Sequence, residues 1–227
     1  YLQLLLDKDP VTRFLAFSAV FEREMIRLLE NENAVPSTEF ADTVIRTLKD
    51  EELMKSCGSM PLLMFESVSD SRFAHEYGKL YSAKQRILRG IAEKYEDTLR
   101  ALYVKYDVSY QADGFEPAVL SAQFKANAVK NLILTILASL DTPDVHCLIR
   151  TQYRNANSAT NRLAALSLYL SSSASDRMDI LLEELARSAE HPLAFENFIA
   201  ASANTAHDTV SYLKVIEASP KFHIEQA

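Results

Sequence analysis

The chain has 227 residues, of which 48% are hydrophobic and 24% charged, and its formal net charge is −7. This mixture is typical of a globular protein with a sizeable core, and the acidic balance disfavours a nucleic-acid-binding surface, which needs a basic excess. Only four glycines and no tryptophan are present, and no apolar run approaches the roughly 18 residues of a membrane span.

Two cysteines, Cys57 and Cys147, are separated by 90 positions (147 − 57), and only His146 neighbours either of them. We therefore expect free, buried thiols in a reducing compartment, and a cytoplasmic protein. The chain begins at Tyr1 rather than at methionine, so we expect it to be a piece of a longer protein.

Six signals for the start of a helix are the clearest feature of the sequence. Each combines a capping residue or a proline with a following apolar run at helical spacing, because proline fits the first helical turn and Asp or Ser caps its free N–H groups. The signals are Asp9-Pro10, Pro36-Ser37, Ser69-Asp70, Glu116-Pro117, Asp141-Thr142-Pro143 and His191-Pro192.

The first half of the chain, 1–115, reads as an irregular helical part. The periodicity predicts helices over 10–30 and from Ser37 to about residue 48, then two short pieces within 50–68 that are broken at Gly58 and Pro61. A long helix is expected from Ser69-Asp70 to about residue 108, with a kink at Gly90, followed by a surface turn at 110–114.

The second half, 116–227, reads as a regular array of helices joined by short connectors. Short connectors force neighbouring helices to be antiparallel, and helical pairs of about 35–40 residues are typical of armadillo or HEAT repeats. We therefore predict one all-α domain over 1–227, built as an α-solenoid of antiparallel helical pairs. The expected helices are 117–140, with 128–140 the most buried stretch, 143–155, 159–171, 176–190, 192–203 and 206–218.

One fragment, His75-Glu76-Tyr77-Gly78-Lys79, begins like the helical zinc motif H-E-x-x-H. Its second histidine is replaced by lysine, whose ammonium group would repel a metal ion, so we interpret the match as a coincidence.

The remaining polar groups give no pattern for catalysis. His146 beside Cys147 is interpreted as a half-buried pair, Ser167 and Ser202 lie in helical runs rather than at sharp turns, and the carboxylates are interpreted as solvated helix faces. We assign no catalytic, cofactor-binding or metal-binding residue.

Several short segments resemble the C-terminal helical domain of the bacterial zinc-dependent aminopeptidase N family. Residues 4–13 (LLLDKDPVTR) are similar to the L-L-x-x-D-x-D-x-F-x-R-W start of that domain, and 156–166 (ANSATNRLAAL) to its A-x-N-M-T-D-x-x-A-A-L stretch. Further similarities are Leu102-Tyr103 with L-L-x-x-Y, Asn131-Leu132 with R-x-L-K-N, 192–198 (PLAFENF) with L-V-x-D-K-W-F, and 219–222 (SPKF) with H-P-x-F.

The sequence also departs from the family. Phe14 and Phe198 stand where the family has tryptophan, and Ser202 stands where it usually has glutamine. The resemblance implies a divergent, non-catalytic domain of a larger aminopeptidase, which walls the substrate cavity and limits access to the N-terminal residue of peptides. Zinc would sit in the catalytic domain of the parent, and the partners would be the preceding catalytic and β domains and the peptide substrates of the parent, without nucleic acid or membrane.

Two alternatives stay open. A free-standing helical-repeat scaffold that binds a protein or peptide would need polar terminal caps, whereas Leu2, Leu4, Leu5 and Leu6 make the N-terminus apolar. A helical enzyme with an unrecognised site would need a deep pocket with shifted ionisable groups. The fragment interpretation predicts exposed apolar surface at both ends of the chain.

Overall fold

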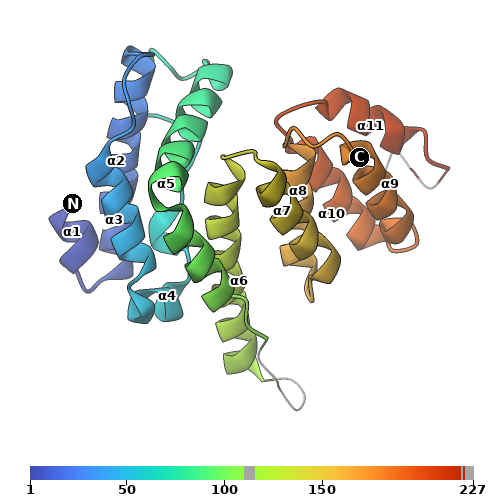
Figure 1. Ribbon diagram of the computed structural model, residues 1–227, viewed down its shortest axis with the longest axis horizontal. Helices are drawn as coiled ribbons and strands as arrows, with labels where there is room; N and C mark the ends of the chain where they lie inside the picture. Colours follow the sequence, from blue (N-terminus) through green and yellow to red (C-terminus); the bar gives the residue numbers. More distant parts are fainter. Residues whose placement is uncertain (110–115, 221, 223–227) are drawn as a thin grey trace. The chain divides into compact units, whose positions relative to one another are not determined.

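The computed structural model describes residues 1–109, 116–220 and 222, and every regular element in these residues is a helix (Figure 1). The chain folds as two compact units, unit 1 over 1–140 and unit 2 over 141–227. This confirms the all-α prediction. The single domain over 1–227, with an irregular part over 1–115 and a regular part over 116–227, stays a prediction. The predicted turn at 110–114 lies outside the described residues.

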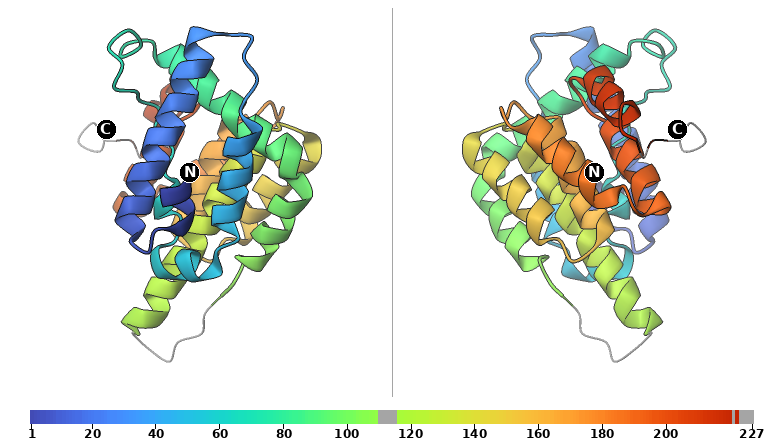
Figure 2. Two further views of the ribbon diagram at one scale, coloured as in Figure 1. Left: turned by 90° about the vertical axis from the view of Figure 1, so that its left-hand side faces the viewer. Right: turned by 90° about the vertical axis from the view of Figure 1, so that its right-hand side faces the viewer.

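Unit 1 contains six α-helices and one short 3₁₀-helix within its described residues. They are α1 (Leu2–Leu6), α2 (Pro10–Glu30), α3 (Thr38–Leu48), α4 (Glu51–Cys57), η1 (Met60–Leu62), α5 (Tyr77–Lys105) and α6 (Pro117–Ala138). Helices α2 and α3 both pack against α5, and α6 packs against α4 and α5 (Figure 2).

Unit 2 contains five α-helices of 9 to 13 residues within its described residues. Consecutive helices pack against each other from α7 to α11, and α10 also packs against α8. They are α7 (Pro143–Asn155), α8 (Ala159–Leu170), α9 (Arg177–Ser188), α10 (Pro192–Ala203) and α11 (Thr209–Glu217).

The start of α2 shows how local sequence sets a helix. Pro10 occupies the first turn, and the Asp9 carboxylate accepts hydrogen bonds from the N–H groups of Val11 and Thr12. These contacts satisfy donors that have no partner inside the helix. Apolar residues recur every three or four positions along the helix, and of these Phe17, Phe21, Met25 and Leu28 are buried while Phe14 is half-buried.

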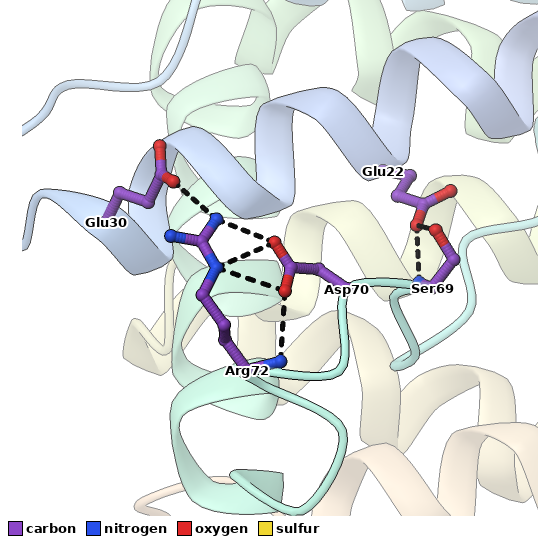
Figure 3. A network of polar contacts seen from close by, with 5 residues as sticks. All are labelled: Glu22, Glu30, Ser69, Asp70 and Arg72. Carbon is purple, nitrogen blue, oxygen red and sulfur yellow. Dashed lines mark hydrogen bonds and ion pairs between the residues drawn. The ribbon is translucent and has the colours of Figure 1, made fainter.

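The expected helix start at Ser69-Asp70 is wrong, because α5 begins at Tyr77. Residues 63–76 instead form a segment, here called the strap, that is bonded to α2. The Ser69 N–H and hydroxyl each donate a hydrogen bond to Glu22 at 2.5 Å, and Arg72 bridges Asp70 and Glu30 (Figure 3). The partners of Ser69 and Arg72 on α2 lie 47 and 42 residues away in sequence, so no local capping rule could identify them.

The expected kink at Gly90 is also wrong. The departure from helical geometry in α5 lies at Tyr95, whose hydroxyl donates to the Asp42 carboxylate of α3 at 2.6 Å, and Lys94 pairs with the same carboxylate. Gly90 serves packing instead, since a Cβ at that position would lie 2.9 Å from the Pro36 Cβ. The glycine lets the chain before α3 lie directly against α5.

The most buried part of α6 agrees with the prediction for 128–140. Val129, Ile133, Leu134, Ile136 and Leu137 are fully buried. Lys130 is buried in the same stretch, where its ammonium group pairs with Asp107 at 2.5 Å and lies over the Tyr103 ring.

The predicted capping role of Asp141 is wrong in detail. Helix α7 begins at Pro143 after Thr142 as expected, but no side-chain hydrogen bond caps it. Asp141 adopts a left-handed backbone conformation with φ of 53°, and its carboxylate accepts a hydrogen bond from the Ser173 N–H at 2.9 Å. The carboxylate thus connects the start of α7 to the α8–α9 loop.

No helix within the described residues is both long and apolar enough to cross a membrane. The expectation of buried thiols is wrong for Cys147, which is exposed, while Cys57 is half-buried.

Candidate functional site

The zinc-like fragment does not form a helical metal motif. His75 is exposed and lies in a turn, Glu76 precedes the first residue of α5, and the Glu76 carboxylate pairs with Lys79 at 3.3 Å. Within the described residues, no group of three or more His, Cys, Asp and Glu side chains is arranged to hold a metal ion.

His146 lies in a polar cluster at the start of α7. Its Nε2 is 2.6 Å from Asp141 Oδ1, and its ring contacts Tyr169 edge-on. Burial opposes ionisation of Asp141, but hydrogen bonds from Ser173 and His146 outweigh it and lower the pKa of the carboxyl below its ordinary value. The Asp141 carboxylate thus holds His146 and the α8–α9 loop in place.

A second polar cluster joins α7, α8 and α9 in unit 2. Glu184 is only 2% exposed, so its interpretation as part of a solvated helix face is wrong. Its carboxylate accepts a hydrogen bond from the Tyr153 hydroxyl at 3.0 Å and pairs with Arg162 at 3.3 Å and Arg187 at 3.4 Å. Burial raises the pKa of Tyr153, and the Glu184 charge adds to this shift. Because each polar group has a partner, we interpret this network as structural.

Ser202 is a buried residue for which the sequence gives no explanation. It is fully buried, and its hydroxyl has no hydrogen-bond partner in the described part of the chain. Ser167 instead donates to the Asn204 carbonyl at 3.1 Å. Within the described residues, neither serine forms a hydrogen bond to a histidine that could activate it as a nucleophile.

An apolar face is exposed at the beginning of unit 1. We call it the N-terminal apolar face and define it by Leu2, Leu6, Val11 and Leu15, which are 56–75% exposed. The four residues come from α1 and α2, which pack against each other. The expectation of exposed apolar surface is therefore confirmed at this end. Near the other end Val210 is 67% exposed and Phe222 is half-buried, while 223–227 lie outside the described residues.

A cleft of about 540 Å³ opens between α5 and the segment that leads into α3; we call it the α3–α5 cleft. Charged residues of α5 line the cleft together with apolar residues. Arg86 donates a hydrogen bond to the Ala34 carbonyl, and Arg89 pairs with Glu93 at 2.9 Å. The apolar lining consists of the exposed Val35, the half-buried Pro36 and the buried Phe40, Ala41, Ile87 and Ile91.

The sequence reasoning did not identify this cleft. Its residues come from two segments about 50 positions apart, and each segment by itself reads as an ordinary amphipathic helix. The one signal in the sequence was Gly90, whose role as a close-packing site is visible only when Pro36 lies against it.

Comparison with known proteins gives a family and a fold. The family model DUF3458_C, described as a domain of unknown function with ARM repeats, matches residues 1–226. Among solved structures, Legionella pneumophila aminopeptidase A in complex with aspartic acid matches with a TM-score of 0.79 at 15% identity. The match covers 99% of this chain and 27% of that one, and no curated protein sequence matches.

These findings confirm the predicted helical-repeat architecture, since the family is described by its ARM repeats. The chain also shares the fold of part of an aminopeptidase, which agrees with the fold that the resemblance implies. At 15% identity the structural likeness carries the fold alone, and the chain spans about a quarter of the protein that it matches.

Proposed function

The chain belongs to the DUF3458_C family of ARM-repeat domains, and from this membership we propose that it is the non-catalytic, C-terminal helical domain of a larger aminopeptidase. The observation that carries the proposal is the extent of the two matches. The family model covers almost the whole chain, and nearly all of the chain aligns with only 27% of an aminopeptidase.

The N-terminal apolar face supports a partner within the same polypeptide. Four exposed leucine and valine side chains on two adjoining helices are costly to leave in water, and apolar patches of this kind mark surfaces that another protein part covers. We propose that the preceding catalytic and β domains of the parent cover this face.

The role of the domain follows from this placement. It would wall the substrate cavity and limit access to the N-terminal residue of peptides, while chemistry takes place elsewhere in a cytoplasmic parent. Because the described residues offer no metal-binding cluster, zinc would be held by the catalytic domain of the parent. We propose no catalytic, cofactor-binding or metal-binding role for any residue of this chain.

The decisive experiment is to read the coding sequence upstream of Tyr1. We expect an H-E-x-x-H helix with a downstream glutamate within the preceding few hundred residues. A start codon at or near Tyr1 would contradict the proposal and would leave a free-standing helical-repeat scaffold that binds a protein or peptide.

A second experiment uses the purified 227-residue chain. Metal analysis and an assay with aminoacyl chromogenic substrates should show neither stoichiometric zinc nor peptidase activity. Stoichiometric zinc would contradict the non-catalytic assignment, whatever the upstream sequence contains.

A further inference from the structure

The α3–α5 cleft has the size and lining of a small-ligand site. Its volume of about 540 Å³ lies within the range of about 300–1,000 Å³ that is typical of ligand pockets, which are mostly apolar with a few placed polar groups. The cleft lies wholly within unit 1.

The charges around the cleft favour an anion. Three cations, Arg86, Arg89 and Lys94, line it together with one carboxylate, Glu93, although the whole chain carries a net charge of −7. Arg89 is neutralised by Glu93 and Lys94 by Asp42. Two of the three cations that line the cleft are therefore paired with carboxylates, and one is left over.

That cation is Arg86, which forms no ion pair with any described carboxylate. Its guanidinium group is half-buried and donates to the Ala34 carbonyl, a neutral acceptor. A guanidinium group carries five N–H donors and binds carboxylates especially well, so Arg86 keeps donors for a further partner.

The walls of the cleft are held in place by contacts within the protein. The Arg27 guanidinium donates to the Val35 carbonyl at 2.5 Å, and the buried Glu24 carboxylate accepts from the Ser37 N–H at 2.6 Å. Pro36 packs directly on Gly90. A site organised before binding loses little conformational entropy when a ligand enters.

We propose that the α3–α5 cleft binds a small ligand that has an apolar body and a single carboxylate. The carboxylate would pair with Arg86, and the apolar body would contact the accessible side chains of Val35 and Pro36. One unpaired guanidinium matches one negative charge. This chemistry is found in the carboxyl-terminal residue of a peptide and in a short fatty acid, and the inference is independent of the proposed function.

The first test compares ligands on the unmodified chain. N-acetyl-leucine, its neutral amide N-acetyl-leucinamide, and hexanoate are titrated while amide NMR shifts are recorded. We expect N-acetyl-leucine to bind about tenfold more tightly than the amide, because a charge-assisted hydrogen bond is lost in the amide. The largest shifts are expected in 34–41 and 86–94.

The three ligands also distinguish the carboxyl terminus of a peptide from a short fatty acid as the natural ligand. Binding of N-acetyl-leucine but not hexanoate supports a peptide carboxyl terminus, and comparable binding of both supports a broader apolar carboxylate site. Equal affinity for the acid and its amide, absence of binding by both acids, or shifts confined to other regions would overturn the proposal.

The second test uses variants. R86Q keeps a donor for the Ala34 carbonyl but removes the charge, so it should abolish the preference for the acid over the amide. R23Q, which makes the same charge change on an exposed residue of α2, should retain the preference. If R86Q fails to fold, V35E at an exposed position of the cleft provides the alternative, and it should weaken binding of the acid alone. Unchanged preference in a folded R86Q or V35E variant would contradict the role assigned to Arg86.

Discussion

Units 1 and 2 are both helical, but they are held together in different ways. In unit 2, short helices follow one another through short connectors, and each consecutive pair is in contact. In unit 1, a 14-residue strap and the segment before α3 are fixed to helices by polar contacts from residues far away in sequence. The comparison shows that helical periodicity predicts structure best where helices pack on their sequence neighbours.

The buried Glu184 carboxylate of unit 2 connects helices that follow one another in sequence, and its removal should have the largest effect on stability. E184A should reduce the free energy of unfolding by about 2–3 kcal/mol, because it leaves the Arg162 guanidinium and the Tyr153 hydroxyl without their carboxylate partner and removes one of the two partners of Arg187. Urea denaturation monitored by circular dichroism measures the change.

The matched control is E183A on the same helix. Glu183 pairs with Arg187 at 3.1 Å from a partly exposed position, so its loss should cost at most about 0.5 kcal/mol. Hydrogen exchange should place the effect of E184A in α7–α9. Equal losses in the two variants would mean that the buried network adds nothing to unit 2.

Gly90 tests how unit 1 depends on distant contacts. G90A should destabilise the protein by about 1 kcal/mol, because overpacking against Pro36 outweighs the better helix propensity of alanine. The control is G78A in the first turns of α5, where a Cβ meets nothing within 4 Å, and it should stabilise the protein by up to about 1 kcal/mol. The same sign for both variants in urea denaturation would refute the packing role.

Ser202 and Ser188 are two buried serines of unit 2 that differ in whether the hydroxyl has a hydrogen-bond partner among the described residues. S202A should be neutral or stabilise the protein by up to about 1 kcal/mol, since it removes a buried hydroxyl without a partner in the described residues. S188A removes a buried hydroxyl that donates to the Glu184 carbonyl at 2.8 Å, and should cost about 0.5–1 kcal/mol. Thermal unfolding of both variants distinguishes them, and a clear loss of stability in S202A would show that its hydroxyl has a partner.

The smallest effect is expected for the acid dependence of unit 2. A hydrogen bond from the Tyr169 hydroxyl, followed by the charge of Arg150, lowers the pKa of Asp176 below its ordinary value of 3.8. The ionised carboxylate therefore stabilises the fold above that ordinary value, and the contribution is lost as pH falls through the lower, folded-state pKa.

D176N should remove this contribution to the acid dependence. Its loss of stability relative to the unmodified chain should be present at pH 5–7 and shrink below about pH 4. Urea denaturation at a series of pH values measures the difference. A difference that does not change with pH would show that Asp176 acts through packing rather than through its charge.

Prediction from sequence was most accurate where a capping residue and the apolar periodicity after it indicated the same helix start. The start of α2 at Pro10 and the start of α3 after Ser37 are set by side chains that cap N–H groups two or three residues away. Sequence reasoning failed at 69–76, at Tyr95 and at Asp141, where partners distant in sequence compete for the same polar groups. It also missed the α3–α5 cleft, because neither lining segment carries a motif.

The sequence by itself determined the helical class, most helix boundaries and the apolar stripes, because helix propensity, capping and 3.6-residue periodicity act within a few residues. Only the tertiary structure decided where the strap binds α2, why position 90 is glycine, and that Arg86 lines the α3–α5 cleft without an ion pair to a described carboxylate. These features depend on distances between residues that are far apart in the chain, and a sequence pattern contains no such distances.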